Sequence, residues 1–171
     1  MGFLMGWYKT FRTLVEPWLQ FFRTIPPIAT IPIMVVAFGV GEQSKIAIIF
    51  VAAFLSSSIT IYQGIKETDK ILIKAAYTFG ASDKDLFLYV TLPSAFPYIL
   101  VAARHALAGS FTTLIAAEMT GATIGLGARI QIASGAARID IVMMGIITIG
   151  ILGFVFDRLL LFVEKRLTRW K

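Results

Sequence analysis

The feature that most constrains this chain is a run of twenty residues, Ile46 to Ile65, that contains no charged side chain. A helix rises about 1.5 Å per residue, so this run reaches about 30 Å, the thickness of the hydrocarbon core of a bilayer. Two further long apolar runs extend from Pro97 to Glu118 and from Ile141 to Val163. Backbone polar groups inside lipid must be satisfied within their own segment, so the runs predict an all-α, polytopic transmembrane helical bundle.

Composition supports a membrane protein and excludes several other classes. The 171 residues are 57% apolar and 15% charged, with a mean hydropathy of +0.80. The net charge of +6 comes from basic residues that flank the apolar runs, so it indicates membrane topology and no nucleic-acid partner. Without cysteine, and with a single histidine, the chain is expected to hold no metal and no cofactor. The same shortage argues against an intramembrane enzyme.

The first forty-five residues are harder to place in a bilayer. Met1 to Tyr8 is too short to span it and is interpreted as the end of a preceding helix, so the chain is expected to be the C-terminal part of a longer transmembrane domain. Tyr8 to Trp18 is predicted to be an interfacial elbow. Three prolines predict a kinked or broken span over about Ile28 to Val40. A turn follows, with Ser44 predicted to cap the next helix.

One polar segment interrupts the apolar chain, from Lys74 to Pro93. Apolar residues at helical spacing precede Gly80, which is predicted to end the helix with a positive φ. Ser82 is predicted to cap a second helix, whose apolar face carries Leu86, Phe87 and Val90. Pro93 is predicted to stop that helix before the next span. The segment therefore reads as two short helices joined by a bend.

The spacing within this segment resembles the EAA loop of ABC-importer permeases, which docks into a cleft on the ATPase subunit. Ala75-Ala76, Gly80, Val90 and Leu92-Pro93 all fall in register with that motif, while Lys74 stands where the family usually has Glu. The resemblance implies a cytoplasmic coupling loop over residues 66–96. The residues that it assigns to ATPase coupling are Lys74, Ala75, Ala76, Gly80, Ala81, Val90, Leu92 and Pro93.

Other segments are similar to the nitrate, sulfonate and taurine group of ABC permeases. They include Ile25-Pro26-Pro27, Phe38 to Glu42, and Ala116 to Ala122 followed by Gly125-Leu126-Gly127. The resemblance implies a single permease domain of the type I importer kind across residues 1–171, in the cell inner membrane. It also implies a homodimer or heterodimer, two cytoplasmic ATPase subunits and an extracytoplasmic substrate-binding protein. The solute is expected to be a small anion such as nitrate, a sulfonate or taurine, or a related small molecule, and ATP hydrolysis would belong to the partner.

The distribution of basic residues predicts the orientation. Twelve of the sixteen lysines and arginines fall on the side of the Lys74 to Pro93 segment, which the positive-inside rule makes cytoplasmic, together with the C-terminus. Lys45, Arg129 and Arg138 fall on the opposite side, and Arg104 lies within a span. The topology and the motif therefore place the coupling loop on the same side by separate reasoning.

The candidate pathway or gate residues are Arg104, Gly109, Ser110, Thr112, Thr113 and Glu118. An embedded charge is costly unless it is paired or hydrated, so Arg104 either reaches the cytoplasmic interface or serves as a gate. Glu118 either holds the neighbouring glycine turn or faces the pathway. The small and hydroxyl residues between them either line the pathway or pack against other helices.

An ion-coupled secondary carrier or channel that works without an ATPase is the alternative function. Such a protein normally carries several intramembrane carboxylates or an inverted repeat. Neither feature is evident in this sequence.

Overall fold

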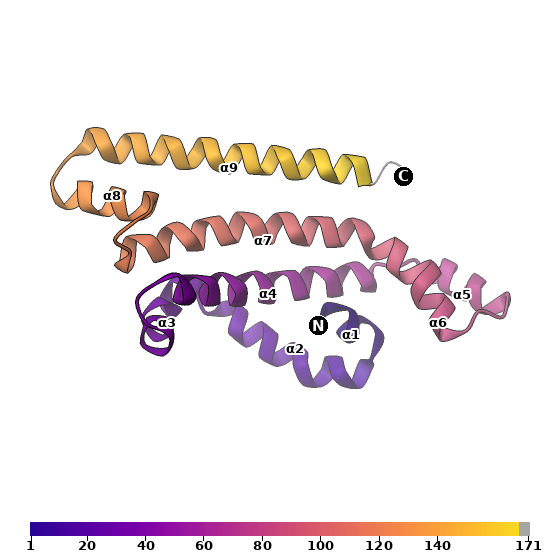
Figure 1. Cartoon of the computed structure of the whole chain (residues 1–171). Coiled ribbons are helices and arrows are strands. Elements are labelled where there is room, and N and C mark those ends of the chain that lie inside the picture. The colour runs from indigo at the N-terminus through magenta and orange to yellow at the C-terminus, as the bar shows by residue number, and fades with distance from the viewer. Residues whose placement is uncertain (168–171) are drawn as a thin grey trace. The chain divides into compact units, whose positions relative to one another are not determined.

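The computed structural model describes residues 1–167, and these are helical with no strand among them (Figure 1). The all-α prediction is confirmed. The helical elements in chain order are α1 (Gly2–Trp7), α2 (Lys9–Thr24), the 3₁₀ helix η1 (Pro27–Thr30), α3 (Ile31–Phe38), α4 (Glu42–Lys66), α5 (Lys70–Thr78), α6 (Asp83–Asp85), the π-helix η2 (Leu86–Thr91), α7 (Leu92–Gly121), α8 (Leu126–Gly135) and α9 (Ile139–Leu167).

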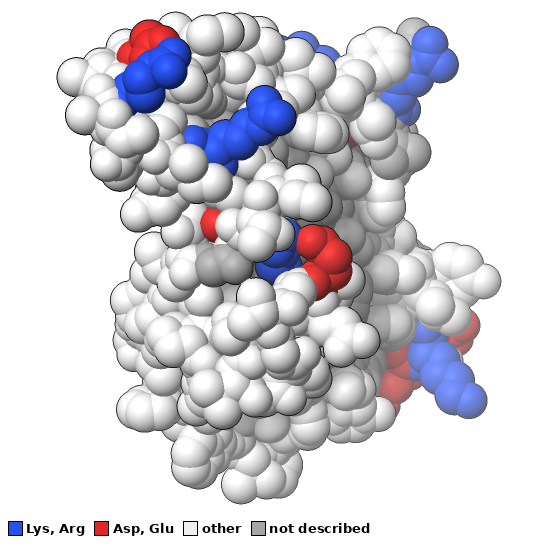
Figure 2. All heavy atoms as spheres, turned by 60° about the vertical axis from the view of Figure 1, so that its left-hand side comes forward, with Lys and Arg blue, Asp and Glu red and all other residues white. Residues whose placement is uncertain are grey.

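Within residues 1–167, three helical stretches are long and apolar enough to cross a membrane, and they contain the three predicted spans. They are Glu42–Lys66, Asp83–Thr120 and Ile139–Arg166. Within their most apolar windows, 22%, 22% and 0% of the residues are buried by the chain itself. Lys, Arg, Asp and Glu side chains are sparse on the face drawn in Figure 2. Most of the span surface is therefore left for lipid or for other subunits to cover.

The region before Gly39 is broken, as the prolines predict. The helix α2 ends at Thr24, and the chain restarts as η1 and then α3 after Ile25 and Pro26. The eight residues of α3 rise about 12 Å, too little to cross a bilayer alone. Together, Lys9–Thr24 and Pro27–Phe38 are long and apolar enough to count as one interrupted span. The predicted elbow at Tyr8 to Trp18 is helical from Lys9 onward and belongs there to α2, while Tyr8 is the extended residue that ends α1.

The prediction that Pro93 ends the second helix of the coupling segment is wrong. Helical structure continues from Asp83 to Thr120, and both Pro93 and Pro97 lie inside it. The backbone amide of Leu92 donates to the carbonyl of Phe87, five residues back, so a π turn closes just before Pro93. Pro93 then occupies the first turn of α7, where a missing N–H is tolerated.

The prediction that Ser44 caps the next helix is also wrong. The helix α4 begins two residues earlier, at Glu42, so Ser44 lies in its first turn. The Ser44 hydroxyl donates a hydrogen bond to the carbonyl of Gly41 at 2.8 Å, and only 3% of the residue is exposed. Gly39, with a φ of 81°, lets the chain leave α3.

The chain divides into two compact units, and the first comprises residues 1–22 and 55–105. Its core contains Met5, Leu19 and Tyr62. Two glycines four residues apart, Gly2 and Gly6, bring α1 against α4, because a Cβ on either would overlap atoms of that helix. This small-xxx-small spacing allows close helix packing, and sequence reasoning missed it.

The second unit comprises residues 23–54 and 106–171, of which 168–171 lie outside the described part. Its core contains Ile31, Ile48 and Ala117. The helix α8 lies beside the first part of α9, where Gly145 leaves room for Ile130 (Figure 1). The predicted interfacial stretch from Ala128 to Arg138 is thus largely α8, with four of its ten residues buried.

Candidate functional site

The candidate coupling segment begins with a helix whose two ends are both fixed by local hydrogen bonds. At the start of α5, the Asp69 carboxylate accepts a hydrogen bond from the amide of Ile71 at 2.8 Å. At its end, the amide of Ala81 donates to the carbonyl of Ala76, and that of Gly80 donates to Tyr77. This pair of bonds is the Schellman motif. Gly80 has a φ of 79°, so the predicted left-handed bend is confirmed.

A capping box starts the second helix, as the position of Ser82 predicts. The Ser82 hydroxyl accepts a hydrogen bond from the amide of Asp85 at 3.3 Å, and the Asp85 carboxylate accepts one from the amide of Ser82 at 3.2 Å. Both bonds satisfy donors that a helix start otherwise leaves open. The direction of the chain after Gly80 is therefore set within five residues.

A side-chain bond across the bend adds a tertiary restraint that the sequence did not reveal. The Tyr77 hydroxyl donates to the Asp83 carboxylate at 2.9 Å, joining the end of α5 to the start of α6. That bond to Asp83 raises the pKa of the Tyr77 phenol above its ordinary value of 10.0. The spacing of six residues across a turn could have suggested the contact only once the bend was known.

We expect the Tyr77 phenol to titrate above its ordinary range, and Asp83→Ala to return it to that range. The raised pKa means that the bond contributes stability below pH 10.0 and loses that contribution as the pH rises past the shifted value. The measurement is tyrosinate absorbance against pH, with Tyr77→Phe subtracted to isolate the one phenol among five tyrosines. Identical titrations before and after Asp83→Ala would show that the bond does not form.

The two halves of the coupling segment differ in burial. Leu86 is 4% exposed. The Phe87 ring contacts the rings of Phe3 and Trp7 edge-on, with distances between ring centroids of 6.0 and 5.2 Å. These contacts anchor η2 in the first unit. In contrast, the apolar side chains of α5 and the bend are left open: Ile71, Leu72 and Phe79 are 73%, 50% and 90% exposed. The helix α5 also packs against η2. An anchored segment therefore presents an uncovered apolar face.

The structure places the predicted coupling residues along this one segment. They run from α5 through the bend and η2 into the first turn of α7. Lys74, Ala75, Gly80 and Pro93 are exposed, while Ala76, Ala81, Val90 and Leu92 are half-buried. Exposed members are available for contact with a partner, and half-buried members hold the shape of the segment.

The candidate pathway residues occupy α7 without forming a single constellation. The hydroxyls of Thr112 and Thr113 donate to the carbonyls of Ala108 and Gly109, at 3.1 and 2.8 Å. Thr113 is buried, Ser110 is half-buried, and Gly109 and Thr112 are exposed. Arg104 is half-buried and engaged with neighbouring groups. Within residues 1–167, His, Asp and Glu side chains do not gather in threes as a metal site would require.

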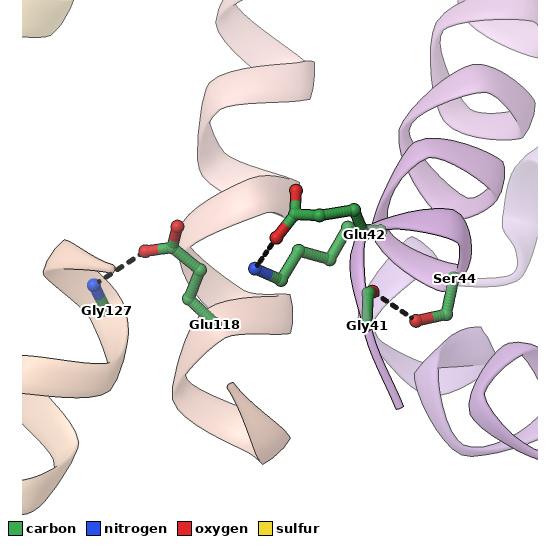
Figure 3. A network of polar contacts seen from close by, with 6 residues as sticks. Gly41, Glu42, Ser44, Glu118 and Gly127 are labelled. Atoms are coloured by element: carbon green, nitrogen blue, oxygen red, sulfur yellow. Dashed lines mark hydrogen bonds and ion pairs between the residues drawn. The ribbon is translucent and has the colours of Figure 1, made fainter. Parts of the chain in front are cut away.

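Glu118 holds the glycine turn, one of the two roles considered for it. Its carboxylate accepts a hydrogen bond from the amide of Gly127 at 2.9 Å, at the start of α8 (Figure 3). Gly125 has a φ of 138°, and a Cβ added there would overlap that carboxylate. The backbone of the turn thus closes directly over the Glu118 side chain.

Glu118→Ala is expected to destabilise the second unit by about 1–3 kcal/mol, because it leaves the amide of Gly127 without its acceptor. Glu118→Gln retains an acceptor oxygen and is the matched control, expected to lose much less. Thermal unfolding of the two purified variants in one detergent measures the difference. Equal losses for both would show that the negative charge, and not the hydrogen bond, holds the turn.

Long apolar helices and an anchored polar segment with a fixed bend define a multi-pass helical membrane protein. The chain belongs to the family of inner membrane components of binding-protein-dependent transport systems, whose model matches residues 1–169. The fold agrees with a solved type I importer: an inward-facing structure of the MetNI methionine ABC transporter aligns with a TM-score of 0.72 and 27% identity. That alignment covers 94% of this chain and 75% of the other.

Permeases of ABC transporters are similar to this chain over 96% to 100% of its length. A probable ABC transporter permease of Brucella abortus (strain 2308) is 46% identical over 171 residues, which are 100% of this chain and 68% of that protein. The taurine transport system permease TauC of Escherichia coli (strain K12) is 38% identical, covering 99% of this chain and 62% of its own length. The nitrate import permease NrtB of Synechocystis sp. (strain ATCC 27184 / PCC 6803 / Kazusa) is 30% identical over 96% of this chain and 60% of its own.

Proposed function

We propose that this chain forms part of the solute pathway of an ATP-driven ABC importer and couples to a cytoplasmic ATPase through residues 66–96. The observation that carries the proposal is the uncovered apolar face of α5. The bend that follows this helix is held by the Schellman bonds on one side and by the capping box of Ser82 on the other. Ile71 and Phe79 are largely exposed, and exposed apolar side chains on an anchored element favour a protein partner. Lys74 adds a positive charge to the same helix.

ATP chemistry would belong to the partner, and this chain would transmit movement. Closure of two ATPase subunits would draw two coupling segments together and shift the attached spans between inward-facing and outward-facing arrangements. The continuous helical stretch from Asp83 to Thr120 supports such transmission, because the coupling segment leads into a span without a loop.

A second permease copy and an extracytoplasmic substrate-binding protein complete the proposed assembly. The helix α9 supports a second copy, because none of its most apolar window is buried within the described chain and another subunit could cover it. The coupling segment and the C-terminus would face the cytoplasm. Of the basic residues on which that orientation depends, Arg169 and Lys171 lie outside the described residues.

The proposed solute is a small anion, such as nitrate, taurine or another sulfonate. The solutes for which similar permeases are named support this class: taurine and aliphatic sulfonates in Escherichia coli, and nitrate in Synechocystis. These proteins are similar to this chain by 38%, 32% and 30% identity.

Co-purification tests the coupling. A tagged chain, expressed with the full coding region of its gene and the neighbouring transporter genes, should recover a nucleotide-binding subunit from solubilised membranes. Ile71→Asp with Phe79→Asp should abolish that recovery while the membrane level persists, because charged side chains cannot enter an apolar cleft without a large desolvation cost. Asp substitution at Ile139, an exposed residue that precedes Asp140 at the start of α9 and lies outside the coupling segment, provides the control. Recovery that survives the double substitution would refute this docking face.

A further inference from the structure

A cavity of about 360 Å³ lies within the second unit. Its walls come from α3, from the start of α4 and from the end of α7 with the turn that follows. Most of the lining is apolar and includes Ile31, Val35, Ile48 and Ile124. A largely apolar hollow of this size with few polar groups is typical of a small-molecule site.

The charged groups of this cavity are Lys45 and Glu42, and they are unequally fixed. The Lys45 ammonium donates to the Glu42 carboxylate at 2.7 Å, and the two side chains are 12% and 78% exposed (Figure 3). The Glu42 carboxylate is open to water, whereas Lys45 is confined by the walls and needs an anion in place of Glu42 when that side chain moves away. Once Glu42 moves away, the fixed charge of the cavity is positive.

Two hydroxyl groups along the wall already use their protons within the chain. Ser44 and Thr120 donate their protons to the carbonyls of Gly41 and Ala116, at 2.8 Å each. Among the described lining residues, Lys45 is the one basic side chain and so the strongest donor for a ligand. The cavity also adjoins the N-terminal end of α4, where the helix dipole favours negative charge.

We propose that this cavity binds a small solute with an anionic head group and a short apolar body, such as an alkanesulfonate. The head group replaces the Glu42 carboxylate on the Lys45 ammonium, and the apolar body lies against Ile31, Val35 and Ile48. Glu42 thereby acts as an internal competitor that occupies the site when no solute is present. The site deepens the proposed function by naming how the anion is recognised, and it rests on that function only for its role in import.

Chain topology gives the site its place in import. The helix α4 begins at the cavity, with Glu42, and ends at Lys66, where the proposed coupling segment begins. A helix that crosses the membrane has its two ends on opposite sides, so a cytoplasmic coupling segment puts the cavity on the extracytoplasmic side. The cavity would then meet the solute before it enters the pathway.

The test is a ligand-observed NMR titration of propane-1-sulfonate against the purified chain in phosphatidylcholine nanodiscs, with no ATPase present. Lys45→Met should weaken binding by about tenfold or more, through loss of the charge-assisted hydrogen bond. Lys45→Arg should retain it. Glu42→Gln should tighten it several-fold by removing the competing carboxylate. Lys9→Met removes an exposed lysine of α2 that belongs neither to the cavity lining nor to the coupling segment, so it is the matched control and should leave binding unchanged.

Several results would overturn the assignment. They are absence of binding to the unaltered chain, equal binding of propylammonium, or binding that Lys45→Met leaves intact. If Lys45→Met does not fold, an affinity of Glu42→Gln for propane-1-sulfonate equal to that of the unaltered chain would overturn the assignment instead. Loss of sulfonate binding when phosphatidylglycerol is added would assign the ammonium to a lipid head group instead. Since no ATPase enters this titration, its failure is distinct from a failure of ATPase co-purification.

Discussion

Gly80→Val is expected to prevent recovery of the ATPase with this chain while leaving its level in the membrane close to normal. Gly80 has a φ of 79°, a conformation that costs a β-branched residue on the order of 1–3 kcal/mol. Apart from its two chain neighbours, no described residue has a heavy atom within 4 Å of where a Cβ would lie, so the effect comes from backbone strain and not from a clash. The measurements are membrane abundance, ATPase co-purification and solute uptake.

Gly80→Asn is the matched control for that experiment. Asparagine tolerates the left-handed region far better than valine, and the surrounding space accepts its side chain. We therefore expect Gly80→Asn to keep most of the co-purification and uptake. Normal uptake by Gly80→Val would remove the bend from the coupling proposal, and equal loss by both variants would point to a direct contact of Gly80 with the partner.

Gly64→Val is expected to reduce the amount of folded protein sharply, because it separates α4 from α7 inside the first unit. A Cβ added at Gly64 would overlap the Cβ of Tyr98, and neither atom can move without its backbone. Overpacking of this kind typically costs about 1–3 kcal/mol, and more where the backbones cannot relax. Abundance in membranes and the midpoint of thermal unfolding in detergent both measure the effect.

Gly150→Val separates that packing effect from the general cost of valine in a transmembrane helix. Gly150 lies within α9, and no described residue outside its own stretch of that helix has a heavy atom within 4 Å of where a Cβ would lie. We expect the isolated chain to tolerate this change. Equal destabilisation by Gly64→Val and Gly150→Val would mean that the contact between Gly64 and Tyr98 does not determine stability.

The spans and the bend could be predicted because their causes are local in sequence. The run from Ile46 to Ile65 shows its length and its lack of charge directly, and α4 contains it. The same holds for Gly80 and Ser82: one residue supplies the positive φ and the other the capping oxygen, and both act within three or four residues. Such features depend little on the remainder of the fold.

Features that depend on distant contacts could not be predicted in the same way. Pro93 predicted a helix end, but the π turn at η2 carries the helix past it, and nothing local distinguishes the two outcomes. The bond between Tyr77 and Asp83 exists only once the bend has formed. The cavity around Lys45 requires three separate segments to meet, so the sequence showed the lysine merely as one charge in a turn.

The π turn makes the rotational setting of the coupling segment depend on a single residue. A π turn holds one residue more than an α turn, and each residue of an α-helix rotates the chain by about 100°. The backbone amide of Leu92 now bonds to the carbonyl of Phe87, five residues back. Deleting one residue from Leu86–Thr91 would shorten this spacing to the four residues of an α-helical hydrogen bond. The face carrying Ile71 and Phe79 would then turn by roughly a quarter of a circle about the axis of α7, on the same rotation per residue. Inserting or deleting one residue in this stretch would therefore rotate the docking face about the axis of α7. A partner that fits the present orientation would then contact a different surface.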